Sequence, residues 1–403
     1  MQTSVMENDE LIYWLALRLV NGVGSLAYKS LLESFKSPYE IFHASFQELV
    51  TVPGIGPRTA SHIKSFNDWQ KIENELNRLK QLSINVITCR DGRYPAILKN
   101  IYDYPPILYV KGILKSDDLN IALVGSRMAS TYGKFTTERL ARELALKGMT
   151  VVSGMARGID SAAHRGALAG RGRTIAVLGC GIDIIYPPEN KHLYDEIADN
   201  GAVISELALG TPPNAPNFPM RNRIISGLSL GVVVVEANER SGSLITARIA
   251  LEQGREVFAV PGNVDTPGSR GTHKLIKEGA KLIENVNDIM DEIMPQIERN
   301  KRDKFPDDGR EENAENNNEK LLDNKRKKSF SLSTQSIFNF SNNEKVIFNI
   351  LTSRPVDVDT IIEKSGLNVN ETLNCLLNLE LYDAILQLPG KLYKRKETSC
   401  LIP

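Results

Sequence analysis

Four short segments of the chain combine glycine, hydroxyl and arginine side chains in a way that suits the binding of phosphate. They are Gly125-Ser-Arg127, the segment 153–158, the run 218–223 and Ser241-Gly-Ser243. Glycine lets a ligand approach the backbone, and the planar fork of arginine matches the oxygens of a phosphate group. The residue types therefore predict a site for a phosphate-bearing ligand.

Several of these residues have a second interpretation that the sequence leaves open. Arg127 directly follows an apolar run, where it either binds phosphate or forms a structural ion pair at the edge of a sheet. Arg221 and Arg223 fall in the expected first turn of a helix, where cations oppose the helix dipole unless an anion is bound nearby. Phe218 either stacks on a nucleobase or anchors the core. Asn222 either contacts the ligand or caps the helix.

Signals for catalysis are weak. Asp160 and His164 are four residues apart and share a helix face, but no activated serine or cysteine accompanies them. We interpret Asp160 as a helix N-cap and His164 as a packing residue. The phosphate-binding loop GxxxxGK[ST] does not occur, and Gly179-Cys-Gly181 lacks the third glycine of a dinucleotide site. We expect no enzymatic turnover.

The cysteines and the first residues indicate where the protein works. Cys89, Cys180, Cys375 and Cys400 show neither CxxC pairing nor metal-ligand spacing, so we expect no disulfide, no metal and no cofactor. The acidic start lacks the cationic region of a secretory signal, and no apolar run reaches the ~18 residues of a membrane span. These features predict a soluble cytoplasmic protein without membrane contact.

The middle of the chain alternates short apolar runs with helical patterns. Runs that are apolar at consecutive positions are typical of strands buried on both faces. This rhythm predicts a doubly wound parallel α/β sheet with helices on both sides, in which ligands bind at the carboxyl ends of the strands. The expected strands are 121–124, 150–152, 174–178, 202–204, 231–235 and 256–260, and the helices between them include 137–146, 161–169, 193–199 and 244–253.

Smaller modules flank this sheet. Residues 1–82 show helical spacing, and the turn Val52-Pro-Gly-Ile-Gly56 fits a helix-hairpin-helix (SAM-like) module. Gly54 and Gly56 there either meet a DNA phosphate or only shape a compact turn. We assign 83–294 to the α/β domain. Charged, asparagine-rich residues predict a flexible linker over 295–340, which separates a small terminal module, 341–403, from the rest.

The charge of the chain is balanced overall but not locally. The 49 Lys and Arg residues equal the 49 Asp and Glu residues, which excludes a polybasic surface. From 125 to 173, however, nine basic residues face three acidic ones, whereas 183–206 holds six acidic residues and one basic residue. The sequence thus predicts a local arginine-lined pocket on a neutral body.

The ordered motifs resemble those of the DprA/Smf (DNA-processing protein A) family of recombination mediators. The resemblance extends over about 94–282. The motifs are Gly125-Ser-Arg127, Ser153-Gly-x-Ala-x-Gly-Ile-Asp160, Leu178-Gly-x-Gly-x-Asp183-x-x-Tyr186-Pro-x-x-Asn190, Phe218-Pro-x-Arg-Asn-Arg-Ile-Ile-x-Gly-Leu-Ser229, Ser241-Gly-Ser-Leu-x-Thr-Ala247 and Gly254-Arg-x-Val-Phe-Ala-Val-Pro-Gly262.

This resemblance implies an extended Rossmann-like domain over 83–294 and a winged-helix module over 341–403. It implies binding of single-stranded DNA and transfer of that DNA to the RecA recombinase during natural transformation or general recombination. It also implies a homodimer formed through the last part of the Rossmann-like domain, and no known catalytic turnover. The candidate residues for binding single-stranded DNA are Ser126, Arg127, Ser153, Gly154, Ala156, Gly158, Lys191, Phe218, Arg221, Asn222, Arg223, Ser241 and Gly242.

Three features depart from the simplest form of this interpretation. Ala208 and His273 stand where the family usually has proline and asparagine, and His273 lies near the expected dimer surface. The expected recognition helix, 369–384, has no Lys or Arg and carries Glu371, Glu380 and Asp383. Because recognition helices use basic and amide side chains, we predict a protein-contact or regulatory role for this module.

Two other functions compete with the mediator. A nucleotide phosphoribohydrolase shares a Rossmann-like fold, but its signature Pro-Gly-Gly-x-Gly-Thr-x-x-Glu is absent from the chain. A winged-helix transcription regulator is disfavoured by the acidic recognition helix. Binding to single-stranded rather than double-stranded DNA, with a salt dependence that Arg127 supplies, distinguishes the mediator from both.

Overall fold

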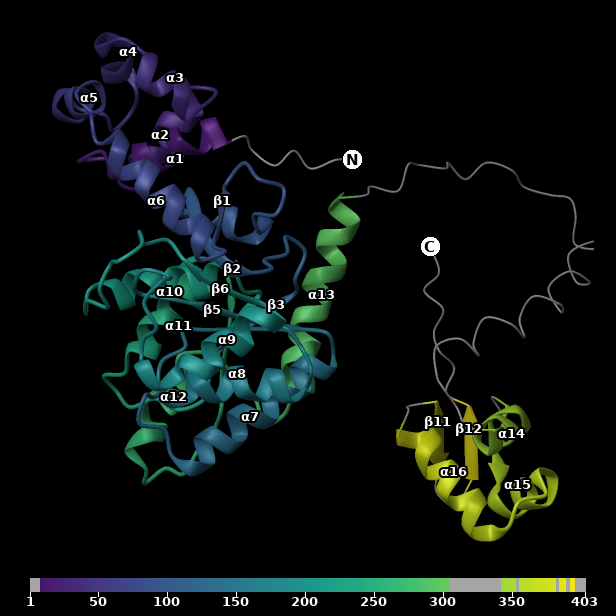
Figure 1. Cartoon of the computed structure of the whole chain (residues 1–403). Coiled ribbons are helices and arrows are strands. Elements are labelled where there is room, and N and C mark those ends of the chain that lie inside the picture. The colour runs from purple at the N-terminus through teal and green to yellow at the C-terminus, as the bar shows by residue number, and fades with distance from the viewer. Residues whose placement is uncertain (1–7, 305–341, 353–354, 382–383, 389–391, 396–403) are drawn as a thin grey trace, which may run out of the picture. The chain divides into compact units, whose positions relative to one another are not determined.

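The computed structural model describes residues 8–304 and, nearer the C-terminus, 342–352, 355–381, 384–388 and 392–395 (Figure 1). Its contacts divide the chain into two compact units, Met1–Asp307 and Asp308–Pro403. Each unit has its own buried apolar core. The two units are described separately below.

A nine-stranded sheet organises the first unit, with the strand order β1-β2-β6-β5-β4-β3-β7-β8-β9. The strands β3 to β9 run parallel, and all six predicted strands are confirmed within about one residue. The parallel strands are β3 (Asn120–Val124), β4 (Thr150–Ser153), β5 (Thr174–Val177), β6 (Ala202–Ser205), β7 (Gly231–Val234), β8 (Glu256–Ala259) and β9 (Lys281–Leu282).

The predicted doubly wound parallel sheet is confirmed, and two antiparallel strands extend it at one edge. Strand β2 (Ile107–Gly112) pairs antiparallel with β6, and β1 (Asn85–Thr88) pairs antiparallel with β2. The two added strands extend the β6 edge. Only 3₁₀ helix and turn separate β1 from β2, so this pair lacks the helical crossover that marks the parallel strands.

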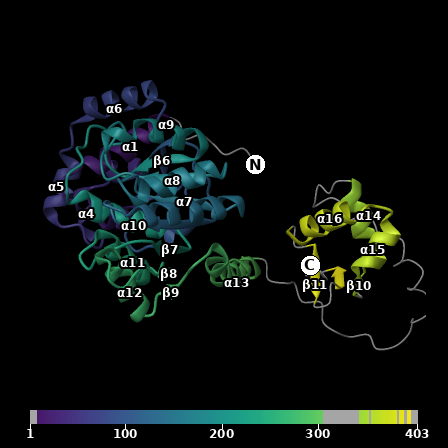
Figure 2. The same ribbon diagram turned by 90° about the horizontal axis from the view of Figure 1, so that it is seen from below.

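Helices cover both faces of the sheet. In β3, Ile121 and Leu123 face the cluster of α7, α8 and α13, whereas Ala122 and Val124 join the opposite core cluster. The helices α10, α11 and α12 follow one another beside β7, β8 and β9 (Figure 2). Their bounds are α7 (Thr131–Leu146), α8 (Ile159–Ala169), α9 (Lys191–Asn200), α10 (Asn217–Gly227), α11 (Gly242–Glu252), α12 (Pro267–Lys277) and α13 (Val286–Lys304). The last helix therefore includes the first ten residues of the expected linker.

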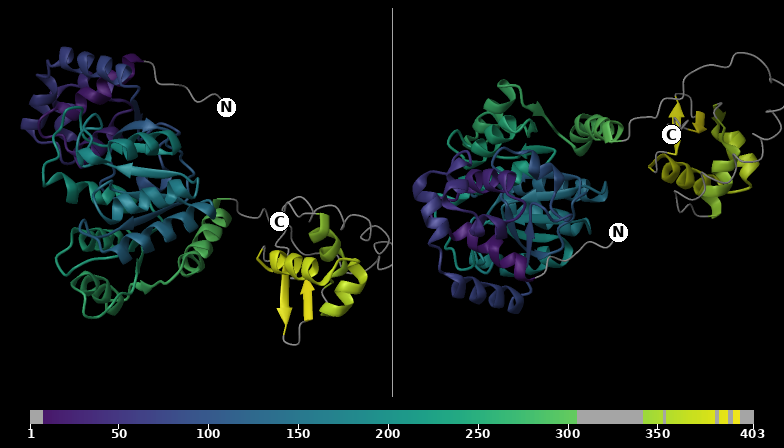
Figure 3. Two further views of the ribbon diagram at one scale, coloured as in Figure 1. Left: turned by 60° about the horizontal axis from the view of Figure 1, so that its bottom comes forward. Right: turned by 90° about the horizontal axis from the view of Figure 1, so that it is seen from above.

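Six helices form the N-terminal module at the end of the first unit opposite α12 (Figure 3, left). The predicted hairpin turn joins α4 to α5, and Gly54 adopts φ +82°, which favours glycine. Glu75 ties the module to the sheet, since it accepts a 2.6 Å hydrogen bond from Tyr109 Oη. The bounds are α1 (Asn8–Leu19), α2 (Ser25–Ser34), α3 (Pro38–His43), α4 (Phe46–Thr51), α5 (Pro57–Lys64) and α6 (Trp69–Gln81).

The second unit packs three helices against a three-stranded antiparallel sheet of order β10-β12-β11. In α16, Glu371 and Glu380 are exposed while Leu376 and Leu379 enter the core. Asp383, also assigned to this helix by the sequence, lies outside the described residues. The elements are α14 (Asn342–Ile350), β10 (Val356–Asp357), α15 (Val358–Ser365), α16 (Val369–Leu381), β11 (Ile385–Leu388) and β12 (Leu392–Arg395).

Candidate functional site

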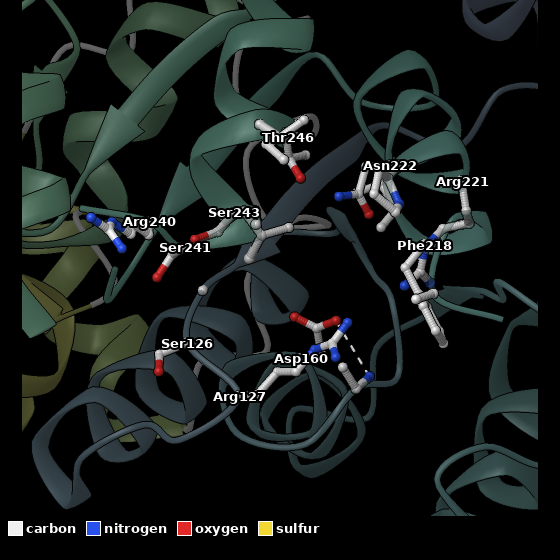
Figure 4. A pocket seen from close by; sticks show the side chains of 18 of the residues that line it. Ser126, Arg127, Asp160, Phe218, Arg221, Asn222, Arg240, Ser241, Ser243 and Thr246 are labelled. Carbon is white, nitrogen blue, oxygen red and sulfur yellow. Dashed lines mark hydrogen bonds between the residues drawn. The ribbon is translucent and has the colours of Figure 1, made fainter. Parts of the chain in front are cut away.

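A cavity of about 640 Å³ opens where β3 and β7 end, which is the point at which the strand order reverses (Figure 4). Open α/β sheets bind ligands at such switch points. The cavity collects side chains from the loops after β3, β4 and β7 and from α10 and α11. Eight of the predicted site residues line it: Ser126, Arg127, Ala156, Phe218, Arg221, Asn222, Ser241 and Gly242.

The turn that carries Arg127 is held in place by close backbone packing. Ser126 N–H donates a 2.7 Å hydrogen bond to the carbonyl oxygen of Glu236, and Ile159 N–H donates to the carbonyl oxygen of Ser126. A Cβ on Gly158 would lie 2.2 Å from that same Ser126 oxygen, and Gly158 has φ +77°. Only glycine fits at this position, so Gly158 positions the turn although it does not line the cavity.

Arg127 and Phe218 meet at the mouth of the cavity. The guanidinium carbon of Arg127 lies 5.2 Å from the centroid of the Phe218 ring, within cation–π range. Arg127 is exposed, and no carboxylate in the described part of the chain lies within ion-pair distance of it. Phe218 is half-buried and packs beside Tyr186, with ring centroids 5.6 Å apart. Both side chains thus keep a surface that a ligand can reach.

Arg221 supports the site from below. Its side chain is 4 % exposed, and Nη1 donates a 2.9 Å hydrogen bond to the carbonyl oxygen of Gly154. Burial lowers the pKa of Arg221 to about 10, partly offset by the charge of Asp160. Burial likewise raises the pKa of Asp160, and the charge of Arg221 opposes that shift. The two buried charges therefore stabilise each other in the wall of the cavity, which both residues line.

Four other predicted residues do not reach the cavity. Arg223 points to the other side of α10, where it pairs with Glu206 Oε2 at 2.6 Å and Asp103 Oδ2 at 3.0 Å. Ser153 is fully buried, and its hydroxyl donates to the carbonyl oxygen of Leu123. Gly154 lies under Arg221, and the exposed Lys191 begins α9. Gly54 and Gly56 also lie elsewhere, in the N-terminal module.

The sequence placed the segment Ser241-Gly-Ser243 at the site but did not single out Ser243, Arg240 or Thr246 as candidate binding residues. Ser243 lines the cavity, is 7 % exposed, and its hydroxyl has no hydrogen-bond partner among the described residues. Arg240 and Thr246 line the same region, and the first turn of α11 holds no acidic residue. A helix N-terminus with a free hydroxyl and a nearby guanidinium is suited to an anion. The Ser-Gly-Ser motif was the available signal for Ser243.

The acidic and imidazole candidates have structural roles that differ in part from the prediction. Gly158, not Asp160, is the N-cap of α8. Asp160 Oδ2 accepts a hydrogen bond from Ala156 N–H at 3.3 Å and so closes the preceding turn. His164 is buried, as predicted, and its Nδ1 lies 2.7 Å from Thr174 Oγ1. Burial lowers the pKa of His164 to about 3. Asp160 and His164 thus serve different neighbours.

Two residues that differ from the usual family sequence, Ala208 and His273, lie away from the cavity. His273 Nε2 is 3.1 Å from the carbonyl oxygen of Gly262 in the loop after β8, while Ala208 lies in the loop before α10. No group of three or more His, Cys, Asp or Glu residues within the described ranges could hold a metal ion. Among the helices described, none combines the length and the apolar character needed to cross a bilayer.

The fold and the site define a class of protein: an α/β protein whose Rossmann-like domain has a ligand-sized cavity at its switch point. A helical module precedes this domain in the chain, and a module of helices and a small antiparallel sheet follows it. Family models match each part. A DNA recombination-mediator protein A model matches residues 85–294, a helix-hairpin-helix model matches 11–75, and a DprA winged-helix model matches 333–391. The chain belongs to the DNA recombination-mediator protein A (DprA/Smf) family.

Individual relatives agree with this assignment. Protein Smf of Synechocystis is 34% identical over 97% of this chain and 100% of its own length. The DNA processing protein DprA of Bacillus subtilis is 46% identical over 56% of this chain and 76% of its own. The X-ray structure of Streptococcus pneumoniae DprA superposes with a TM-score of 0.62 and 36% identity, covering 70% of this chain and 98% of that one.

Proposed function

We propose that the cavity binds single-stranded DNA and that the protein loads the RecA recombinase onto that DNA during DNA uptake or recombination. The observation that carries the first part is the exposed Arg127 lying over the half-buried Phe218 at the mouth of the cavity. An aromatic face beside a guanidinium offers both a stacking surface for a base and a partner for its phosphate. Membership of a recombination-mediator family supports the second part.

The form of the cavity favours single strands over duplexes. Its volume of about 640 Å³ is that of a small-molecule site, which admits splayed-out nucleotides but not a stacked double helix. Phe218 stacks one base, and Arg127 binds the adjoining phosphate. The N-terminus of α11, with Ser243 and Arg240, provides a second phosphate contact across the cavity. Binding through unstacked bases is largely independent of sequence.

Fluorescence anisotropy over a salt series tests this function. We expect tighter binding of single-stranded than of double-stranded oligonucleotides. Arg127→Ala should weaken single-strand binding and reduce the slope of log K against log salt by about 0.7, the value for one lost phosphate contact. Arg139→Ala is a matched control, because Arg139 lies on α7 and pairs with Glu143. Equal or tighter duplex binding, or an unchanged slope in Arg127→Ala, would refute the proposal.

The protein is proposed to act without catalytic turnover. Asp160 accepts from Ala156 N–H and lies in hydrogen-bond contact with the hydroxyl of Ser153, while His164 contacts Thr174. Ser153 is fully buried and its hydroxyl donates to the carbonyl oxygen of Leu123, so it is not placed to act as a nucleophile. Incubation with nucleoside monophosphates should therefore release no free base. Release that depends on Asp160 would favour the phosphoribohydrolase alternative instead.

We further propose RecA and a second copy of the chain as protein partners in the cytoplasm. The C-terminal part of the Rossmann-like domain, around α12 and His273, is proposed to form the dimer surface. Val264, just before α12, is 74 % exposed and supports this placement. Light scattering should report a dimer, and Val264→Glu should shift it toward the monomer. An unchanged mass would place the interface elsewhere.

The C-terminal module is proposed to contact a protein or regulate the first unit. Its helix α16 has no Lys or Arg and exposes Glu371 and Glu380, which repel a phosphate backbone. The exposed Val369 and Leu373 on the same helix suit a protein surface better. A chain truncated at Ser329 should therefore retain single-strand binding, and loss of that binding would refute the assignment. The acidic helix equally disfavours the winged-helix transcription regulator.

A further inference from the structure

A second hollow continues from the cavity across the first turn of α10. It has a volume of about 890 Å³, and Pro219 and Ile245 line both hollows. A third, of about 220 Å³, shares Met220 with the second and reaches Gly24 and Ser25 at the start of α2. The three hollows thus follow one another from the switch point of the sheet to the N-terminal module.

Exposed apolar side chains line the second hollow. Tyr102 is 75 % exposed, Met220 is 58 % exposed and Ile245 is 42 % exposed. Side chains of this size are left in water at a cost unless a partner covers them, so a continuous apolar surface of this kind marks an interaction site. Tyr102 in particular presents a ring on which a base can stack.

Two lysines line this hollow, and one of them, Lys29, lies beside the Tyr102 ring. Lys29 Nζ lies 5.9 Å from the ring centroid of Tyr102 and 5.3 Å from that of Tyr104, while Lys99 Nζ lies 5.7 Å from the Tyr94 centroid. Neither ammonium is within ion-pair distance of a carboxylate in the residues that the structure describes. Asp103 is paired with Arg223, and Glu252 is the acidic group of the hollow that has no ion-pair partner among the described residues.

The two sides of this hollow are held together. Lys29 belongs to α2 of the N-terminal module, whereas Tyr102 follows the 3₁₀ helix Ala96–Asn100 of the Rossmann-like domain. Arg90 Nη2 donates to the carbonyl oxygens of Leu32 and Phe35, at 2.8 and 3.3 Å, and so fixes the end of α2 to the domain. The hollow is therefore a built surface of one unit.

We propose that the DNA strand leaves the cavity over Pro219 and Ile245 and enters this second hollow, where a base stacks on Tyr102 and the backbone runs between Lys29 and Lys99. This inference rests on the proposed single-strand binding and names the path of the flanking nucleotides. Continuity with the cavity and the combination of an exposed ring with unpaired ammonium groups favour a nucleic acid over a protein here.

Oligonucleotide length separates this path from the cavity. We would measure competition by oligothymidylates of about 4 and about 16 nucleotides, the range of single-strand site sizes. Tyr102→Ala should weaken the binding of the longer oligonucleotide about tenfold and leave the binding of the shorter one unchanged. Tyr102→Phe, which keeps the ring, should bind both like the parent chain. Lys29→Gln should reduce the salt slope for the longer oligonucleotide only. Tyr39→Ala is the control, an exposed tyrosine of the N-terminal module outside the hollow.

The outcomes are distinguishable. Suppose that Tyr102→Ala and Lys29→Gln leave the affinity for both oligonucleotides unchanged, while Arg127→Ala weakens the binding of both. The path is then wrong and the proposed function stands. If Arg127→Ala also changes neither, the proposed function fails as well. Photocrosslinking of 5-iodouracil placed along the longer oligonucleotide gives an independent check. It should label the peptide that contains Tyr102, and labelling confined to cavity residues would overturn the path.

Discussion

The guanidinium of Arg221 donates a 2.9 Å hydrogen bond to the carbonyl oxygen of Gly154, directly beneath the candidate binding cavity. A Cβ on Gly154 would lie 2.5 Å from Arg221 Nη2, so the glycine is needed for this approach. The turn after β4 therefore rests on a buried cation from α10. Arg221 therefore supports the structure of the site, whereas the exposed Arg127 can contact a ligand, although both are arginines of the same site.

Replacement of Arg221 should act on stability. Arg221→Met keeps much of the volume but leaves Gly154 without its donor and Asp160 without its compensating charge, and we expect a loss of about 3–5 kcal/mol in the free energy of unfolding. Guanidinium denaturation followed by circular dichroism measures it. The exposed Arg127→Met should stay within about 0.5 kcal/mol. Equal stability of the two variants would show that Arg221 is not a support.

Gly179 is expected to control the position of the Phe218 ring. A Cβ at Gly179 would lie 2.8 Å from Phe218 Cδ1 and 3.1 Å from Cε1, so Gly179→Ala must displace the ring from Arg127. We expect a loss of single-strand affinity of about 1 kcal/mol or more, the lower end of the range for base stacking. In a Phe218→Ala background the same substitution should have no further effect. Additive losses in anisotropy titrations would contradict this mechanism.

Ser243 should contribute to binding but not to stability. Its buried hydroxyl has no partner among the described residues, so Ser243→Ala removes an unsatisfied group and should leave the melting temperature equal or slightly higher. Single-strand affinity should fall by about 0.5–1.5 kcal/mol if the hydroxyl donates to phosphate. The salt slope should not change, because no charge is removed. Ser229→Ala, which deletes a satisfied buried hydroxyl, should show the opposite pattern.

His164 should make the fold sensitive to acid. Thr174 Oγ1 donates to the carbonyl oxygen of Val151, so it accepts from His164 Nδ1–H, and Nε2 is buried without a partner among the described residues. The folded-state pKa of about 3 lies below the ordinary 6.5, so the unfolded chain binds more protons between these values. Stability is then fully present above pH 6.5 and falls as the pH drops toward 3.

Urea unfolding at pH 7 and pH 5 tests this. At pH 5, which is about 1.5 units below the unfolded-state pKa of about 6.5, this residue should lower the free energy of unfolding by about 2 kcal/mol. His164→Asn keeps a donor near Thr174 but does not titrate, so it should lose about 2 kcal/mol less than the parent chain over the same interval, whatever its stability at pH 7. The same pH dependence in both proteins would show that another group is responsible.

The sequence was sufficient for much of the fold. Consecutive apolar residues marked the six central strands, because only strands covered on both faces are apolar at every position. It missed β1 and β2. Strand β1 begins with an exposed residue and lacks this signature, whereas β2 carries it in the four buried apolar residues 107–110 but stands outside the alternation of strands and helices that located the others. The sequence also located the binding loops, because residues that follow the strands of a parallel sheet must gather at one edge of that sheet.

What the sequence determined was therefore the position of the site along the chain. It proposed Arg127 and Phe218 as candidates but left open whether Phe218 meets a ligand or anchors the core. What the tertiary structure alone decided was the direction of each arginine of α10. Residues two apart in a helix are separated by about 200° around its axis, so Arg221 and Arg223 face opposite sides. Which side meets the cavity depends on the packing of α10 against the sheet. That packing directs Arg221 to Gly154 and Arg223 to Glu206 and Asp103.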